Sequence, residues 1–296
     1  MIQNEIEKYR IAGRVAAVTR AYARSIIAEN VTLLELADKI EHFIIKRGLK
    51  PAFPVNIGIN NISAHYTPSS DDIGILKKGD VIKIDLGAHL EGYIADTAIT
   101  IEVGTDNYSK LIDASAEALN LALELLKPEL EVNVIGSCIE NAITARGFKP
   151  VKNLTGHSMS RYRLHGGKAI PNVRTSGTNK IKLGEVLAIE PFATNGEGKV
   201  NERGYGNIYR FVRDKEPRSK EGRVLIKYIK ENFGTLPFAE RWCCRVIDKP
   251  KPVLRELMRD LVITGYPILQ EADNSIVTQA EHTAIVTENG CEIITK

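Results

Sequence analysis

The sequence has few cysteines, no long apolar run and little net charge. Its four cysteines are scattered, and the adjacent pair Cys243-Cys244 is badly placed to bridge itself or to form a C-x-x-C site, so reduced thiols are expected. Every apolar run is far shorter than the about 20 residues that span a bilayer. The N-terminus, Met1-Ile2-Gln3-Asn4, lacks the basic-then-apolar layout of a signal peptide. These absences predict a cytoplasmic protein without a membrane partner.

The composition allows a full hydrophobic core. With 43% apolar residues, 296 residues can form one large domain or two ordinary ones. The net charge of +3 is unevenly spread, because residues 201–260 hold 15 Lys and Arg against 9 Asp and Glu, which gives +6 there and leaves −3 elsewhere. A solvated charged surface explains this stretch most simply, and a basic face that contacts RNA or the ribosome is the alternative.

Two pairs of helices are predicted, each followed by β-rich sequence. The first pair covers residues 5–27 and the stretch from Thr32 to Gly48, where Thr32 and Glu35 form a capping-box pattern. The second pair has apolar residues at three- and four-residue steps over 111–125 and 135–143. Strands are predicted at 81–86, 93–103, 186–193 and 282–287. The order of helices and strands predicts an α/β protein with an internal duplication.

One local alignment supports the duplication. Residues 78–85 match residues 183–190 without gaps, and in both copies a glycine, an acidic residue and an apolar strand lead to a carboxylate, Asp85 or Glu190. Chance similarity is the alternative, since apolar strands after a glycine turn are common. The second half is interrupted by charged, helix-like sequence over residues 196–264, which predicts an inserted helical subdomain.

The two carboxylates of the first half indicate a cation site. Asp85 ends an apolar strand, where an ionised carboxylate is costly unless it is paired or binds a metal. If a hairpin turns about Leu90-Glu91, Asp96 faces Asp85 directly, and the like charges repel. An ion pair with a nearby lysine or arginine would explain one carboxylate, but a divalent cation explains the pair.

Three residues of the second half complete the candidate site. Glu190 occupies the position that the repeat relates to Asp85, and Glu281 shares a strand face with Thr283, whereas His282 lies on the other face. His157 follows a glycine, although a lone histidine is more often a core residue than a ligand. Four carboxylates and one imidazole suit a pair of divalent ions, which can activate hydroxide at neutral pH.

The remaining candidates have simpler explanations. His42 is predicted in a helix and His89 in a hairpin turn, and we expect both on the surface. The run Gly196-Glu197-Gly198 indicates a turn, because it is too weak a pattern to predict phosphate binding.

Several motifs, in order along nearly the whole chain, resemble type II methionine aminopeptidase in its archaeal short form. Together they are far more specific than any one of them. The motifs are Pro51-Ala52-Phe53-Pro54-Val55-Asn56, Ala64-His65-Tyr66-Thr67-Pro68, Asp85-Leu86-Gly87 with Asp96, Gly156-His157-Ser158, Tyr162-Arg163-Leu164-His165-Gly166-Gly167-Lys168, Ile189-Glu190-Pro191-Phe192 and Gln279-Ala280-Glu281-His282-Thr283.

The resemblance implies a role for each candidate ligand. Asp85 would bind one metal ion, His157 and Glu190 the other, and Asp96 and Glu281 would bridge the two. Two divalent ions are implied, with Co²⁺, Mn²⁺, Fe²⁺, Zn²⁺ and Ni²⁺ as candidates, and the sequence leaves the choice open.

The resemblance also implies the substrate-side residues and the fold. His65 and His165 would contact the scissile amide, and Glu190 would shuttle the proton of the attacking hydroxide. Phe53, Leu164 and Tyr266 match positions that line the methionine pocket, although apolar residues are by default core. The implied fold is a single pita-bread α/β domain over residues 1–296, in a monomer, with the type II insertion at 196–264.

The implied activity is removal of the initiator methionine from nascent chains whose second residue is small. An X-Pro peptidase of the same fold is one alternative, but it normally brings a large N-terminal domain, and too little sequence precedes Asp85 for one. A non-catalytic protein of this fold that binds RNA or other proteins is the other alternative. It would be marked by lost metal ligands, and all five are present.

Overall fold

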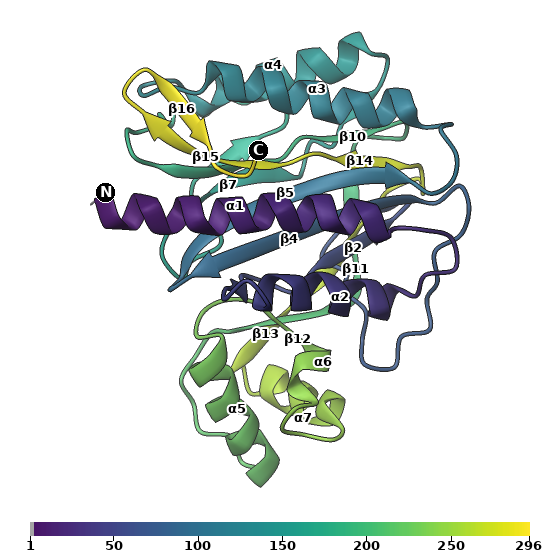
Figure 1. Cartoon of the computed structure of the whole chain (residues 1–296), viewed down its shortest axis with the longest axis vertical. Coiled ribbons are helices and arrows are strands. Elements are labelled where there is room, and N and C mark those ends of the chain that lie inside the picture. The colour runs from purple at the N-terminus through teal and green to yellow at the C-terminus, as the bar shows by residue number, and fades with distance from the viewer. Residues whose placement is uncertain (1–2) are drawn as a thin grey trace.

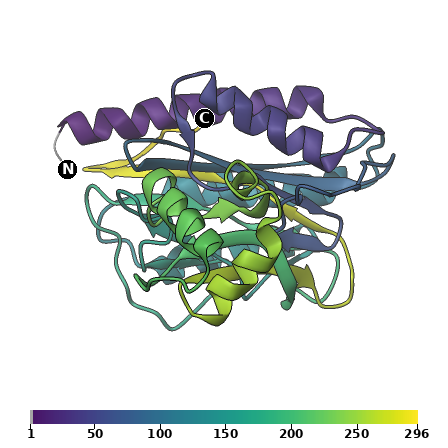
Figure 2. The same cartoon turned by 90° about the horizontal axis from the view of Figure 1, so that it is seen from below.

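The first half of the chain places two helices across an antiparallel sheet. The computed structural model describes residues 3–296, so Met1 and Ile2 of the N-terminal segment considered above lie outside it. Figures 1 and 2 show α1 and α2 as a layer over β4 and β5. Thr32 Oγ1 accepts a hydrogen bond from Glu35 N at 3.2 Å, which confirms the predicted cap of α2. The elements are α1 (Gln3–Ile26), α2 (Leu33–Ile45), β1 (Lys50–Pro51), β2 (Asn56–Ile59), β3 (Ile62–Ala64), β4 (Val81–Leu90) and β5 (Tyr93–Glu102).

The second half repeats this plan, with α3 and α4 packed on its strands (Figure 1). Its main sheet has the order β16-β15-β9-β7-β8, and a smaller sheet has the order β14-β10-β6. The elements are α3 (Ser109–Leu125), α4 (Val132–Ala145), β6 (Lys149–Pro150), β7 (Thr155–Met159), β8 (Ala169–Pro171), β9 (Val186–Ile189), β10 (Phe192–Thr194), β14 (Val277–Gln279), β15 (His282–Thr287) and β16 (Gly290–Ile293).

The predicted duplication is visible in equivalent hydrogen bonds at the start of β4 and β9. Gly79 and Gly184 both have positive φ, 87° and 80°, a conformation that glycine adopts without steric cost. Gly79 N donates to Val103 O at 2.7 Å, and Gly184 N donates to Val286 O at 2.9 Å. The two glycine turns therefore start equivalent strand pairs, β4 with β5 and β9 with β15.

The halves meet across an approximate two-fold axis. Ala98 lies five residues before Val103, and Glu281 lies five residues before Val286. Ala98 and Glu281 pair with each other, with backbone N···O distances of 3.4 and 3.2 Å. Equivalent residues that pair with each other lie on or near the axis that relates the halves. The duplication thus brings the second strand of each half to a common centre.

Two equivalent threonines join the halves at this centre. Thr283 Oγ1 donates to Asp96 O and accepts from Asp96 N, both at 2.8 Å. Thr100 Oγ1 does the same with Gln279 O at 2.6 Å and Gln279 N at 2.8 Å. Gln279 of the second half is therefore the counterpart of Asp96 of the first.

The segment 196–264 contains helices, as its sequence suggested, but also strands that were not predicted. It has its own apolar cluster, which includes Leu225, Phe238 and Leu254. In Figure 1 its helices project away from α3 and α4. Its independence as a subdomain stays a prediction. Its elements are β11 (Val200–Phe211), α5 (Lys220–Asn232), β12 (Phe238–Ala239), α6 (Glu240–Cys243) and α7 (Pro250–Arg259), and β11 pairs with β13 (Ile263–Glu271).

Two predictions about the β4–β5 hairpin were wrong. The turn lies at Glu91-Gly92, where both residues have positive φ as in a type I′ turn, so Asp96 faces Gly87 and lies diagonal to Asp85. His89 is buried, only 6% exposed, because β4 continues through it to Leu90, and its Nδ1 accepts a hydrogen bond from Gly92 N at 3.0 Å inside this turn. His42 is exposed, as predicted.

Within residues 3–296, no helix combines the length and the apolar character that crossing a membrane requires.

Candidate metal centre

The five predicted ligands come from both halves and line one cavity of about 100 Å³. Asp85 lies in β4 and Asp96 in β5, His157 lies in β7, and Glu190 and Glu281 lie directly after β9 and before β15. All ten residues that the sequence singled out for the site line this cavity: Phe53, His65, Asp85, Asp96, His157, Leu164, His165, Glu190, Tyr266 and Glu281.

The distances around His157 suit ligands of a common ion. His157 Nε2 lies 3.8 Å from Asp96 Oδ2 and 3.6 Å from Glu190 Oε1, which is too far for hydrogen bonds. Ligand atoms of Asp96, His157 and Glu281 all lie within 4.8 Å of one another. Two ligands that each stand about 2.0–2.2 Å from one cation are separated by roughly 3–3.5 Å, so small shifts would bring this group around an ion.

Buried oxygen atoms without partners support a cation in this cavity. Among residues 3–296, Asp85 Oδ1, Asp96 Oδ1, Glu281 Oε2 and the side-chain oxygen of Gln279 are buried and accept no hydrogen bond. Buried polar atoms are normally satisfied, and unpaired ones indicate a missing ion or water. The donor set, oxygen atoms with one imidazole nitrogen, is one that Mn²⁺, Fe²⁺, Co²⁺ and Zn²⁺ accept. The residues therefore fit a divalent metal site.

The carboxyl groups are strongly perturbed by their surroundings. Burial raises the pKa of Asp85 to about 7. Burial, followed by the charges of neighbouring carboxylates, raises the pKa values of Asp96, Glu190 and Glu281 well above the usual range. A bound cation would reverse this effect, because it stabilises the ionised form of each group.

The histidines are neutral near pH 7 for the same reason. Burial lowers the pKa of His157 to about 3 and that of His65 to about 4, and it also lowers the pKa of His165. The ring centroids of His157 and His165 lie 4.6 Å apart. The ring centroid of Tyr266 lies 5.2 Å from that of His65 and 6.3 Å from that of His165. Neutral imidazoles can bind a metal or exchange hydrogen bonds with an amide.

Glu281 rather than His282 faces the cavity, as the strand alternation predicted. His282 Nδ1 instead lies 2.8 Å from Thr295 Oγ1 and 3.1 Å from Arg20 Nη1, on the opposite side of the strand.

Sequence reasoning missed several residues of the site. Ile208 and Pro237, both from the segment 196–264, extend the apolar wall to which Phe53 and Leu164 belong. Gln279 belongs to a quoted motif, but no role was assigned to it, and its Nε2 donates to Glu190 Oε2 at 3.4 Å. The only signal for Gln279 was its position seven residues before Val286, which mirrors that of Asp96 before Val103. That signal can be recognised only after the structure has shown how the two halves correspond.

The buried set of carboxylates and imidazoles between two related halves identifies the chain as a metal-dependent hydrolase. Comparison with known proteins agrees. A model of metallopeptidase family M24 matches residues 7–228. The methionine aminopeptidase of Methanocaldococcus jannaschii is 45% identical over 290 residues, which cover 98% of each chain.

Solved structures show the same fold. The methionine aminopeptidase of Thermotoga maritima has a TM-score of 0.74 at 24% identity and covers 100% of this chain and 98% of its own. The prolidase of Pyrococcus furiosus has a TM-score of 0.64 at 20% identity, and the match covers 99% of this chain but 64% of the prolidase. The chain belongs to metallopeptidase family M24 and has the pita-bread fold of that family.

Proposed function

We propose that the chain is an aminopeptidase that removes the initiator methionine from nascent proteins whose second residue is small. One observation carries the proposal: a single cavity joins the five candidate metal ligands and two neutral histidines to an apolar wall. The wall, which includes Phe53, Leu164 and Tyr266, suits an unbranched apolar side chain. The name of the Methanocaldococcus relative supports the same activity.

In this proposal Asp85, Asp96, His157, Glu190 and Glu281 would hold two divalent ions, which when bound would supply a water-derived nucleophile at neutral pH and Lewis acidity toward the scissile carbonyl. Glu190 accepts the proton of the nucleophile and returns it to the leaving amine. His65 and His165 donate hydrogen bonds to the scissile amide and its developing oxyanion. The identity and number of the ions belong to the proposal.

The activity is tested with purified protein and added Mn²⁺, Co²⁺ or Fe²⁺. Methionine should be released from Met-Ala-Ser but not from Met-Lys-Ser, because the cleft must admit the second side chain close to the ligands. Glu190→Gln and His157→Ala should each reduce release at least about 100-fold, since each removes a ligand and Glu190 also carries the proton. No release with any metal would rule out the proposed activity.

A peptide with proline in second place separates this activity from that of the prolidase. Release of the first residue only when proline follows it would favour an X-Pro peptidase. The match with the Pyrococcus furiosus prolidase leaves about a third of the prolidase chain without a counterpart in this chain.

We further propose a cytoplasmic monomer that meets nascent chains near the ribosome. The support is the charge of residues 201–260, in which Arg213, Arg218 and Lys220 are exposed. Reversing these three charges should weaken co-sedimentation with ribosomes and make it less sensitive to salt. Arg210 is left intact, because its charge lowers the pKa of His165 in the cavity. Unchanged co-sedimentation would argue against the contact.

A further inference from the structure

His65 has a strained backbone at the edge of the cavity. Its φ is 65°, in the left-handed region that few residues other than glycine adopt. Such a conformation is strained and persists only where neighbouring structure holds it. One restraint is local, because His65 N donates to Asn56 Oδ1 at 2.8 Å.

The second restraint comes from β11, in the segment 196–264. A Cβ atom on Gly206 would lie 1.5 Å from His65 O, so only glycine lets the two backbones approach this closely. Thr67 N donates to Gly206 O at 3.0 Å, and Asn207 Nδ2 donates to Thr67 O at 3.0 Å. β11 therefore holds the chain directly after His65.

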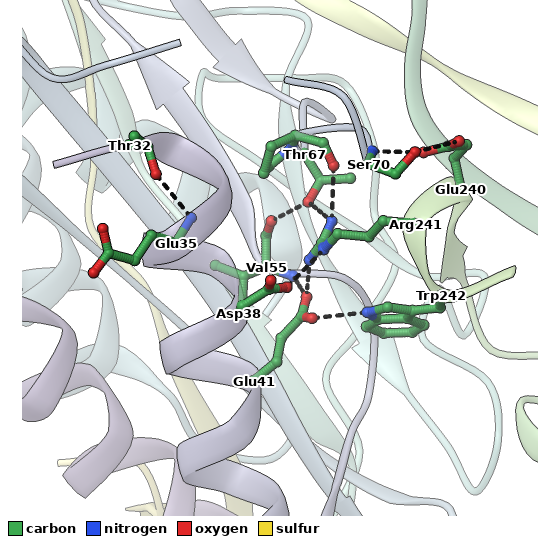
Figure 3. Close-up of polar contacts among 11 residues, drawn as sticks. Thr32, Glu35, Asp38, Glu41, Val55, Thr67, Ser70, Glu240, Arg241 and Trp242 are labelled. Carbon is green, nitrogen blue, oxygen red and sulfur yellow. Dashed lines mark hydrogen bonds and ion pairs between the residues drawn. The ribbon is translucent and has the colours of Figure 1, made fainter. Parts of the chain in front are cut away.

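The third restraint comes from α6, whose Glu240 and Arg241 side chains reach the same loop (Figure 3). Arg241 Nη1 donates to Thr67 Oγ1 at 2.8 Å and to Pro68 O at 3.0 Å. Glu240 accepts from Ser70 N at 2.9 Å and from Ser70 Oγ at 3.1 Å. Two consecutive side chains of α6 thus bind three residues of the loop.

The same helix is fixed to the first half through Glu41 of α2 (Figure 3). Glu41 accepts hydrogen bonds from Arg241 Nη2, from Trp242 Nε1 at 2.7 Å and from Val55 N at 3.1 Å. The side chains of Arg241 and Glu41 are 4% and 6% exposed, so neither charge could be left without its partner. We name Glu41, Glu240, Arg241 and Trp242 the clasp.

We propose that the clasp is a positioning device that holds the His65–Ser70 loop, and with it the imidazole of His65, in the geometry that cleavage needs. The segment 196–264 would then support the active site in addition to carrying the basic surface proposed to contact the ribosome. This inference rests on the proposed function, in which His65 contacts the scissile amide. A misplacement of about 1 Å can cost about 100-fold in rate, so a rigid mounting of His65 matters.

The test compares Arg241→Met with Lys251→Met. Lys251 of α7 pairs with Asp71 at 2.5 Å, which joins the same two parts of the chain, but the pair is exposed. With metal bound and both variants folded, Arg241→Met should lower kcat for Met-Ala-Ser about 10- to 100-fold while KM changes less than about threefold. Lys251→Met should match the unmodified protein in both.

Amide hydrogen exchange supplies a readout that does not need activity. In metal-free protein, the amides of His65, Thr67 and Ser70 should exchange at least about tenfold faster in Arg241→Met, because their loop loses its restraint. Exchange in β9 and β15 should not change. If Arg241→Met does not fold, Thr67→Val, which removes the hydrogen bond from Arg241 Nη1 to the loop but keeps the buried Arg241–Glu41 pair, carries the same test.

Unchanged kcat together with unchanged loop exchange would overturn the inference. Loss of kcat without faster loop exchange would overturn it as well, because the effect would then not pass through the loop. If the unmodified protein releases no methionine, the proposed function fails, and the exchange data still decide whether the clasp holds the loop.

Discussion

Four carboxyl groups share one buried cavity, and burial raises the pKa of each of them. The pKa of Asp85 rises to about 7, and the pKa values of Asp96, Glu190 and Glu281 are raised well above the usual range by burial, followed by the charges of neighbouring carboxylates. A metal ion binds the ionised forms only, so protons and metal compete for these residues.

Metal affinity is therefore predicted to decrease as the pH is lowered through the neutral range. Below pH 7 Asp85 is mainly protonated in the metal-free protein, and its proton must leave before the ion binds, which costs about tenfold in affinity per pH unit for each proton displaced. Calorimetric titration with Mn²⁺ in buffers of different ionisation enthalpy measures both affinity and protons released.

The expected result is weaker binding at pH 6 than at pH 8, with at least one proton released at pH 6.5. Asp71→Asn, which removes an exposed acid that does not line the cavity, should leave the proton count unchanged. Equal affinity at both pH values, with no proton released, would contradict the predicted shifts.

At the residue level, the sequence singled out the candidate ligands better than the residues that hold them in place. Asp85 and Glu190 stand out because a carboxylate at the end of an apolar strand is costly, and the repeat relates them. The roles of His65 and His165 came from the resemblance alone. The strain at His65 could not be predicted, because its loop is contacted by Gly206 and Arg241, which are distant in sequence.

At the level of elements, tertiary pairing decided where sequence patterns failed. The hairpin register was two residues off, because Glu91-Gly92 forms a turn with two positive φ angles that alternation alone does not reveal. β11 was missed because its sequence is polar and contains two glycines, and it forms a strand because β13 and β12 pair with it.

The two threonines that join the halves allow a matched pair of variants. Thr283→Val and Thr100→Val each leave one buried N–H and one buried C=O unpaired, so each should lower the free energy of unfolding by about 2–4 kcal/mol. Only Thr283 holds a predicted metal ligand, Asp96. We therefore expect Thr283→Val to weaken Mn²⁺ binding about 10-fold or more, and Thr100→Val to weaken it less.

Denaturant unfolding of metal-free protein measures the first effect, and calorimetric Mn²⁺ titration measures the second. A similar loss of stability with a difference in affinity is the expected pattern. Equal Mn²⁺ affinities in the two variants would show that the threonine contact does not orient Asp96.

At the level of the whole molecule, the candidate metal centre bridges the two halves. Asp85 and Asp96 belong to the first half, whereas His157, Glu190 and Glu281 belong to the second. Metal ions held by these five residues would tie the halves together, and the unfolded chain does not form such a site. Metal binding should therefore stabilise the fold as a unit.

The stabilisation can be estimated by mass action. With free Mn²⁺ at 100 times its Kd, the free energy of unfolding should rise by about 2.7 kcal/mol per site, and the unfolding midpoint should shift with metal concentration. Asp85→Asn should lose much of this shift, and Lys251→Met should keep it. A midpoint that does not depend on Mn²⁺ would rule out metal binding to the folded state.

The most direct test of the central claim follows bound metal and methionine release in one titration. Mn²⁺ is added stepwise to metal-free protein, the bound ion is counted, and the initial rate on Met-Ala-Ser is measured at each step. We predict that the rate rises with bound Mn²⁺, saturates when no more than two ions are bound, and stays near background in Glu190→Gln. Full release without bound metal, or Mn²⁺ binding that leaves the rate at background, would contradict the account.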